Sequence, residues 1–561
     1  MAFSRVSDCK YTKCVLIFGH ISILFCNLVA EKRLFLTIFC DKNYFFTVTH
    51  PENTPASTYF TPRNHHLFNP INNETMTIKD LKPANVFGIF HEITQVPRPS
   101  KKEGKIRQYL LDFAAKHNLE VKTDAIGNVA IFKPATPGHE DAPGIIMQAH
   151  MDMVCESNHK GFDFENTPIT TIVDGDWLHA DGTTLGADNG IGIAGALAAL
   201  TDDSLVHGPL EGLFTVDEET GLTGANNIGD GMIKGKMLLN LDSEDDAQIF
   251  IGCAGGVDTT CTFNYERSMA PADFHYFKFD LSKGLGGHSG SDINAGRANA
   301  VQLMARFLWG LSQKHDIALC EIDGGNLRNA IPRAAHVIFG VHTSRKEEVV
   351  ALFNMFAADV EAEYKGLETT MELKLDTADK PDFSVDADTS RRLIAAMYCC
   401  PHGVISMSRD IEGLVETSTN LASVKMLEGS KILVTTSQRS SVESRKWDIA
   451  HRVEALFKLA GAEVTHGDGY PGWAPNMDSR IMKIAADAYE ELYHIRPAIM
   501  AIHAGLECGL FLTKYPELDM VSFGPTLQNV HSPSERMFIP AVDRYWNQLK
   551  RIIEKVADLK D

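Results

Sequence analysis

Apolar and polar positions along this chain are spaced in two distinct ways. From Pro83 to Val96 and from Lys102 to His117, apolar residues recur with the period of a helix. Nearly continuous apolar runs follow at 145–147, 212–216 and 237–241. A strand covered on both faces of a sheet has such a run rather than a strict alternation. The pattern therefore predicts an α/β fold in which buried strands alternate with helices.

From about Val257 the pattern changes to β-α-β-β-α-β, the split unit of a ferredoxin-like sandwich. The expected segments are strands at 274–281, 317–321, 335–342 and 370–375 and helices at 299–315 and 346–365. A partial second round ends in a strand at 463–466. We therefore expect an inserted two-part α+β domain at 257–470. It would interrupt a first domain made of residues 76–256 and 471–561.

Shorter signals complete the expected first domain. A surface hairpin is predicted from 174–177 and 180–184, and a pair of strands from 121–123 and 128–132. After the inserted domain, helices are expected at 479–493 and 540–556 and strands at 498–502 and 520–524.

The first 75 residues differ from the rest. Val15 to Ala30 is an apolar run that follows three basic residues, which is the outline of a signal peptide, and it is short for a membrane span. Residues 55–73 are polar and typical of a linker or of disorder. We expect residues 1–75 to be disordered or to lie outside the functional protein, which would start near Met76. A genuine export or anchor signal is the alternative.

Composition narrows the class of protein. The 561 residues include 53 Lys and Arg against 73 Asp and Glu, a net charge of −20. This balance argues against nucleic acid or an anionic membrane surface as the main partner. The 11 cysteines form no CxxC pair, and several lie in apolar surroundings, as reduced core cysteines do. A cytoplasmic location is therefore expected, with export or membrane anchoring as the alternative if the 15–30 run is a genuine signal.

Polar residues that could carry chemistry follow the predicted buried strands. They are His150 and Asp152, Asp188 in a glycine-bearing loop before a helix, Glu218 and Glu219, and Asp242. A single acid at such a place is ordinarily a solvated turn or a helix cap. Residues i and i+2 of an extended chain point to one side, so His150 and Asp152 can act together. Four acidic loops in succession, with one histidine, predict a site for a hard cation with nitrogen and oxygen ligands.

Nine segments resemble a known family when they are read in order. They are QAHMDMVCE, TTLGADNGIGIA, FTVDEETGLTGA, NLDSEDD, IGCAGG, GGHSG, LRNAIPR, HAGLECGLF and GPTLQNVHSPSE, between about residues 80 and 555. The set resembles M20 family metallopeptidases of the aminoacyl-histidine dipeptidase (Xaa-His dipeptidase, PepD) type. The resemblance implies a zinc-peptidase-like catalytic domain with a mixed central sheet flanked by helices, and an inserted lid or dimerisation domain. Residues 1–75 fall outside it.

The resemblance also implies a ligand set for two divalent metal ions. His150 and Asp242 would hold one ion, Glu219 and His531 the other, and Asp188 would bridge them. Zinc is expected, although histidine and carboxylate ligands also accept Mn²⁺ or Co²⁺.

Two further acids would be catalytic. Glu218 would be the general base, and we expect it to point away from Glu219 because neighbouring strand residues face opposite sides. Asp152 would support His150 and the surroundings of the metal.

Five residues would contact substrate. His288 in GGHSG would reach the substrate or an oxyanion on closure or across a dimer, unless it is only a turn histidine. Asn329 and Arg333 could bind a substrate carboxylate, which a guanidinium suits. His503 and Glu507 would line the pocket.

The predicted function is therefore a dinuclear metal-dependent dipeptidase acting on Xaa-His and other unblocked dipeptides. We expect a homodimer with no nucleic acid or membrane partner. Two alternatives stay open at this point: an amidohydrolase acting on N-acyl amino acids, and a non-catalytic metal-binding scaffold.

Overall fold

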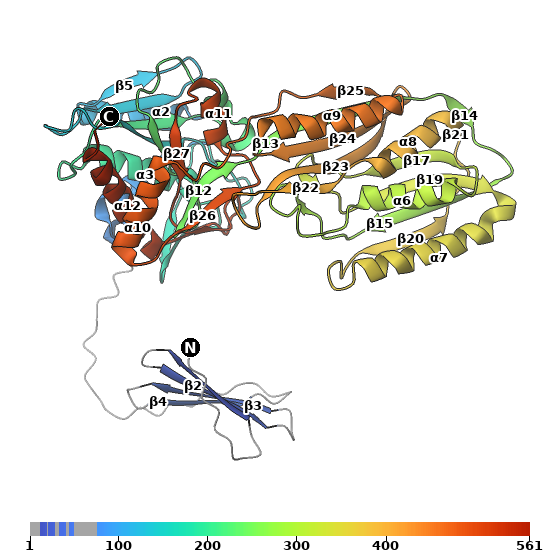
Figure 1. The fold of residues 1–561 in the computed structure, drawn as a ribbon, viewed down its shortest axis with the longest axis horizontal. Helices are drawn as coiled ribbons and strands as arrows, with labels where there is room; N and C mark the ends of the chain where they lie inside the picture. The colour runs from blue at the N-terminus through green and yellow to red at the C-terminus, as the bar shows by residue number, and fades with distance from the viewer. Residues whose placement is uncertain (1–11, 19–20, 29–32, 41–43, 50–75, 561) are drawn as a thin grey trace. The chain divides into compact units, whose positions relative to one another are not determined.

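The computed structural model describes residues 12–18, 21–28, 33–40, 44–49 and 76–560 (Figure 1). The chain divides into two units, residues 1–74 and 75–561. In the first unit, four strands pair in chain order as an antiparallel sheet: β1 (Thr12–Phe18), β2 (Ile21–Leu28), β3 (Arg33–Cys40) and β4 (Tyr44–Thr49). The predicted signal-like run covers part of β1 and all of β2, and the predicted linker at 55–73 lies outside the described residues. That residues 1–75 are disordered or lie outside the functional protein stays a prediction.

The second unit contains an eight-stranded mixed sheet. Its strands, in spatial order, are β26 (Ala498–Ile502), β12 (Gln248–Cys253), β27 (Asp519–Ser522), β11 (Met237–Asn240), β7 (Ile145–His150), β10 (Leu210–Thr215), β6 (Val129–Lys133) and β5 (Glu120–Thr123). The central strands β27, β11, β7 and β10 are parallel, whereas β6 and β5 add antiparallel pairings. Every residue of β7, β10 and β11 is buried, as their apolar runs predict.

Helices cover both faces of this sheet. The helices are α1 (Ala84–Thr94), α2 (Gly104–Lys116), α3 (Ala187–Thr201), α4 (Glu218–Gly221), α5 (Thr223–Asn226), α10 (Arg480–Tyr493), α11 (Glu507–Lys514) and α12 (Ile539–Ala557), with a 3₁₀ turn η1 (Ile78–Asp80). Met147 of β7 belongs to the core shared with α1, α3, α10 and α12, whereas its neighbour Ile146 packs with Phe511 of α11. The alternation of β7 side chains thus joins two cores.

A separate small sheet contains the predicted surface hairpin, but the predicted strand limits are wrong. The strands are β8 (Thr171–Asp174) and β9 (Trp177–Ala180), joined to β28 (Leu527–Gln528) and β29 (Arg536–Phe538). Gly175 has a φ of +57°, in the left-handed region that glycine adopts without strain. The turn therefore falls at Gly175 and Asp176, inside the segment expected to be a strand.

Residues 255–466 of the second unit are built around a nine-stranded antiparallel sheet, and we call them the inserted domain. The strands are β20 (Glu372–Thr377), β15 (Phe274–Ser282), β19 (Ala335–His342), β17 (Ala318–Gly324), β23 (Val415–Leu427), β24 (Lys431–Ser440), β13 (Gly255–Asn264) and β25 (Glu463–His466), with β22 (Gly403–Met407) beside β23. Its helices are α6 (Ala300–Ser312), α7 (Lys346–Glu363), α8 (Ala387–Cys399) and α9 (Glu443–Leu459), with a 3₁₀ turn η2 (Thr343–Arg345). Two short pairs, β14 (Arg267–Met269) with β21 (Phe383–Val385) and β16 (Gly287–His288) with β18 (Ala330–Ile331), flank it.

The inserted domain consists of two ferredoxin-like units joined edge to edge. Strands β20-β15-β19-β17 form one unit, and β25-β13-β24-β23 form the other. In each unit the spatial order is the fourth, first, third and second strand of that unit along the chain. The units meet where β17 pairs with β23 at Asp323 and Gly324. The second round, predicted to be partial, is therefore a complete ferredoxin-like unit, and β13 is its first strand.

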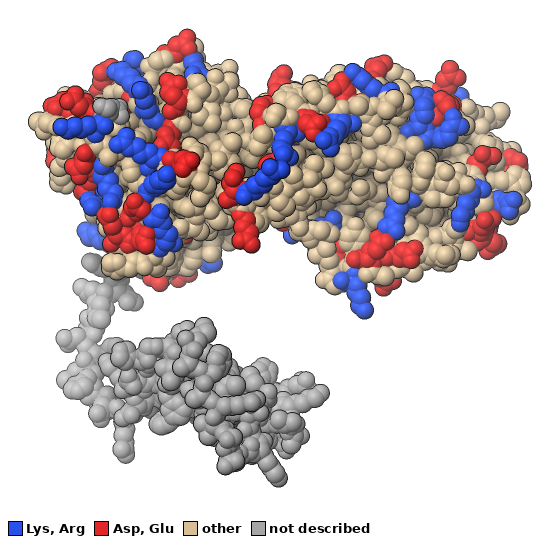
Figure 2. Space-filling view, viewed as in Figure 1, with Lys and Arg blue, Asp and Glu red and all other residues tan. Residues whose placement is uncertain are grey.

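The surface in Figure 2 shows Lys and Arg side chains interspersed with Asp and Glu on the described residues in view. Among the described residues, no helix combines the length and apolar character needed to cross a bilayer.

Candidate metal centre

The candidate ligands come from one edge of the eight-stranded sheet. His150 is the last residue of β7, Asp242 follows β11, and Glu219 lies in α4, just after β10. These strands are parallel neighbours, so their carboxyl ends lie together. Asp188 is in the first turn of α3, and His531 lies in the loop between β28 and β29.

Asp188 lies between two histidines. Its Oδ1 is 3.0 Å from His150 Nε2, and its Oδ2 is 3.1 Å from His531 Nε2. His150 Nε2 is also 3.3 Å from Asp242 Oδ1, and His531 Nε2 is 3.0 Å from Glu219 Oε2. The five side chains therefore form two groups of three that share Asp188, and in each group the ligand atoms lie within 4.8 Å of one another.

Asp152 contacts both His150 and the backbone that carries Glu218 and Glu219. Its side chain is fully buried, and its two oxygens accept the backbone N–H groups of Glu218 (3.0 Å) and Glu219 (3.2 Å). Its Oδ1 also lies 3.5 Å from His150 Nδ1. One carboxylate thus orients both the histidine ring and the turn that carries the two glutamates.

The predicted geometry of that turn is wrong. β10 ends at Thr215, Asp217 has a φ of +50°, and a short helix begins at Glu218. Glu218 and Glu219, as consecutive helical residues, are therefore rotated by about 100° from each other rather than placed on opposite sides. Ligand atoms of Glu218, Glu219 and His150 still lie within 4.8 Å of one another.

The charges of the cluster are strongly coupled. Burial opposes ionisation of Asp188, but its contacts with His150 and His531 outweigh burial and lower its pKa. Hydrogen bonds to Asp188 and Glu219 raise the pKa of His531 to about 11. Burial raises the pKa of Asp242 to about 6. These opposed shifts show that the carboxylates of the cluster are stabilised by nearby positive charge.

Three other acids lie around the cluster. Burial, followed by the charges of Asp242 and Glu507, raises the pKa of Glu218 well above 4.5, with His150 opposing them. Burial raises the pKa of Glu507 to about 7, where Gln148 (2.6 Å) and Thr215 (2.8 Å) donate to its Oε2. Burial also raises the pKa of Glu244 to about 8.

Sequence reasoning missed the residues that fix the Asp188 loop. The buried Glu535 carboxylate accepts backbone N–H groups of Leu185 (2.7 Å), Gly186 (3.0 Å) and Ala187 (2.8 Å). The buried guanidinium of Arg98 donates to the carbonyl oxygens of Asp152 (2.6 Å), Met151 and Gly186. Asn189 donates to Asp242. The residue pattern does not indicate the roles of Glu535 and Arg98, because their hydrogen-bond partners are backbone groups.

The residues fit a pair of divalent ions. Glu219 Oε1 and Glu507 Oε1 are buried, and neither has a hydrogen-bond partner among the residues that the structure describes. Unsatisfied buried carboxylate oxygens are costly unless a cation binds them. Two histidines and three carboxylates that share one bridging acid are the donor set of a two-metal hydrolase.

Comparisons with known proteins bear on the family of this chain. A sequence model described as peptidase family M20/M25/M40 matches residues 146–555. The chain is 39% identical over 480 residues to the cytosol non-specific dipeptidase of Escherichia coli, covering 85% of this chain and 99% of that protein. The chain belongs to peptidase family M20/M25/M40.

Solved structures of two peptidases have a similar fold. The aminoacylhistidine dipeptidase of Vibrio alginolyticus superposes with a TM-score of 0.80 at 42% identity, over 86% of this chain and 98% of that one. A tripeptidase of Staphylococcus aureus gives a TM-score of 0.51 at 16% identity, over 85% of this chain and all of that one, which bears on the fold alone. The expected peptidase class and the mixed sheet flanked by helices are therefore confirmed.

The residues expected to contact substrate lie in two places in this peptidase. Glu507 faces the ligand cluster, and His503 Nε2 is 2.7 Å from Ser418 Oγ of the inserted domain. His288, Asn329 and Arg333 instead line a cavity of about 790 Å³ in the inserted domain. No candidate metal ligand is among the residues lining that cavity.

Proposed function

We propose that this chain is a dinuclear metal-dependent dipeptidase. The observation that carries the proposal is the position of Asp188, whose two carboxylate oxygens each contact a different histidine. Such a carboxylate can bridge two ions without moving from its loop. His150 and Asp242 would bind one ion, and Glu219 and His531 the other. Zn²⁺ is the ion we propose, with Mn²⁺ and Co²⁺ as substitutes that the same ligands accept.

Ions bound there would polarise the scissile carbonyl and lower the pKa of the attacking water to ~7. The chain's own residues would move the proton. The Glu218 carboxylate would take one proton from the attacking water as its oxygen bonds to the carbonyl carbon. The protonated Glu218 would then give that proton to the leaving amine as the C–N bond breaks.

Asp152 would serve as the positioning group for this transfer. It fixes the backbone of Glu218 and Glu219 and the ring of His150 with one carboxylate. Ligand orientation by such a group commonly changes metal affinity or activity 10- to 100-fold.

The proposed substrates are unblocked dipeptides, including those with C-terminal histidine. The names of the Escherichia coli and Vibrio alginolyticus relatives support this class. His288, Asn329 and Arg333 would contact substrate from the inserted domain, acting as a lid or across a homodimer. Arg333 is exposed, so its guanidinium is free to bind a carboxylate. His503 and Glu507 would line the near side.

A cytoplasmic location is also proposed. The name of the Escherichia coli relative supports it, as do the free thiols of the seven cysteines from Cys155 to Cys508.

The test compares the full chain with its Glu218→Gln and Glu219→Gln variants on β-alanyl-histidine, other dipeptides and N-acyl amino acids. We expect the wild type to cleave dipeptides and to stop when a chelator is added. Glu218→Gln should keep its metal and lose turnover about 10²- to 10⁴-fold. Glu219→Gln should lose metal as well, which separates the base from the ligand.

Other outcomes would redirect the proposal. Cleavage of N-acyl amino acids alone would identify an amidohydrolase with the same centre. Metal binding without any hydrolysis would identify a scaffold. Full activity of Glu218→Gln would remove it from the mechanism.

A further inference from the structure

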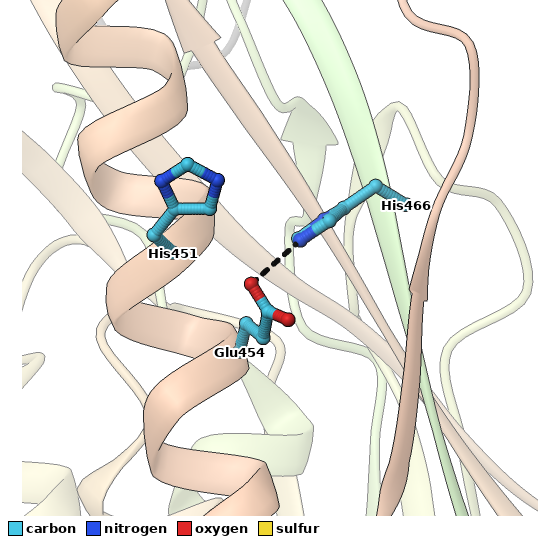
Figure 3. A group of neighbouring side chains, drawn as sticks. All are labelled: His451, Glu454 and His466. Carbon is cyan, nitrogen blue, oxygen red and sulfur yellow. Dashed lines mark hydrogen bonds and ion pairs between the residues drawn. The ribbon is translucent and has the colours of Figure 1, made fainter.

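Three side chains of the inserted domain form a second cluster of metal-binding groups. His451 and Glu454 lie on α9, and both face His466 at the end of β25 (Figure 3). One ligand atom from each lies within 4.8 Å of the others. His466 Nε2 is 3.2 Å from Glu454 Oε2. The spacing of i and i+3 places the first two residues on the same side of the helix.

The ring of His466 is held by a buried hydrogen-bond chain. Its Nδ1 is 2.9 Å from Thr259 Oγ1, which donates to Gln438 Oε1 at 2.7 Å. The amide orientation of Gln438 follows from Thr436, whose hydroxyl donates its one hydrogen to the carbonyl oxygen of Thr259 (3.4 Å) and therefore accepts from the Gln438 side-chain nitrogen (2.7 Å). Thr259 and Gln438 are both fully buried.

These hydrogen bonds determine which ring nitrogen of His466 carries a hydrogen. A hydroxyl has one hydrogen, and Thr259 gives it to Gln438. Thr259 must therefore accept the hydrogen of His466 Nδ1–H. The free nitrogen is then Nε2, the atom that faces Glu454. Histidines that bind metals commonly have this arrangement, with the second ring nitrogen bonded to a fixed acceptor.

A nitrogen lone pair directed at a carboxylate oxygen needs a proton or a metal ion between them. Lys458 bonds the other oxygen of Glu454, so Oε2 is the oxygen left for that cation. Four ligands at 2.0–2.2 Å in a tetrahedron are about 3.3–3.6 Å apart. His466 Nε2 and Glu454 Oε2, at 3.2 Å, are close to this separation. His451 is exposed, so its ring can close the remaining distance of at most about 1.5 Å by a change of rotamer.

We propose that His451, Glu454 and His466 bind one divalent transition-metal ion. Two imidazoles and a carboxylate form a donor set that favours Zn²⁺, with Co²⁺ and Ni²⁺ as substitutes. Three protein ligands leave one coordination position open to water. The ion would join α9 to β25, the last strand before the chain leaves the inserted domain.

The experiment counts ions on the full chain. Wild type and the His451→Ala and Glu454→Gln variants are stripped of metal and dialysed against rising free Zn²⁺, and bound metal is measured by mass spectrometry. We expect wild type to bind one more ion per chain than either variant. The difference does not depend on how many ions the catalytic centre holds. His342→Asn is the matched control, because His342 forms a surface pair with Asp273 in the same domain.

Trp447 supplies a second readout, since its ring lies 5.8 Å from that of His451 and 5.7 Å from that of His466. Co²⁺ or Ni²⁺ should quench Trp447 fluorescence in the wild type, with an at least ten-fold weaker apparent affinity in His451→Ala. Quenching is assigned by subtracting the signal of Trp447→Phe. Equal metal counts in wild type and both variants would overturn the proposal. His466 would then be the protonated partner of Glu454 in an ordinary ion pair.

Discussion

Asp188 reaches both histidines because groups outside the site fix its backbone. Glu535 is 2% exposed and accepts three consecutive backbone N–H groups just before Asp188. Burial raises the pKa of Glu535 to about 7, with the charge of Asp188 acting in the same direction. A carboxylate in this position combines the function of a helix N-cap with that of a loop anchor.

Glu535→Gln should therefore weaken the site without touching a ligand. The amide places N–H hydrogens against backbone N–H donors and cannot accept all of their bonds. We expect metal affinity or kcat to fall about 10- to 100-fold while the circular dichroism spectrum is retained. Glu165→Gln, on the surface beside Lys102, is the control. Unchanged metal affinity in Glu535→Gln would show that the loop is held by other contacts.

His402 gives a pH dependence of stability away from the metal centre. Its Nδ1 accepts from Asn299 Nδ2 (3.3 Å) and from the backbone N–H of Leu421 (3.4 Å), and burial lowers its pKa from 6.5 to about 4. The unfolded chain then binds more protons than the folded chain between these two values. Stability is complete above about pH 6.5 and falls as the pH drops toward 4.

His402→Asn should flatten this dependence, because its oxygen can accept a hydrogen bond and does not titrate. In urea unfolding of the wild type, we expect His402 to lower the free energy of unfolding by up to about 1.4 kcal/mol for each pH unit of acidification in this window. The variant should lose less stability over the same window. Identical slopes for both proteins would contradict the assignment.

At the scale of elements, the sequence predicts strands better than the ends of strands. The apolar runs in β7, β10 and β11 identify buried strands because both of their faces are covered. The step from β10 into α4 could not be predicted, since Asp217 adopts the left-handed region where its backbone N–H donates to Glu103, 114 positions away. That step decides how Glu218 and Glu219 diverge.

The strand β13 was missed for a related reason. Its buried Thr259 and half-buried Asp258 and Thr260 interrupt the apolar pattern, and the buried threonine hydroxyl is satisfied by Gln438, 179 positions away. A local pattern contains no information about such a partner. For the site, the quoted segments indicate the candidate ligands and include Glu535, but the bonds that Glu535 and Arg98 make to backbone groups leave no mark in the residue pattern.

At the scale of the whole second unit, the inserted domain contacts the first domain close to the site. A Cβ added to Gly290, in the loop after His288, would lie 2.2 Å from the carbonyl oxygen of His503. His503 in turn bonds Ser418 of the inserted domain. This close backbone approach fixes the loop after His288 against the first domain.

Gly290→Ala should therefore separate the two domains locally. We expect kcat/KM for dipeptides to fall by up to about a hundred-fold, because small misplacement of contacting groups is costly, while metal content is retained. Gly310→Ala in α6 is the matched control, since a Cβ there meets nothing within 4 Å. Equal kcat/KM in both variants would argue against a role for this contact in catalysis.

The measurement that most directly tests the central claim is the metal content of single-ligand variants of the full chain, with the His451–Glu454–His466 cluster disabled by His451→Ala. The shared position of Asp188 predicts that Asp188→Ala loses both ions of the catalytic centre. Asp242→Asn and Glu219→Gln should each weaken one ion at least ten-fold more than the other. Retention of two tightly bound ions by Asp188→Ala would contradict the bridged centre.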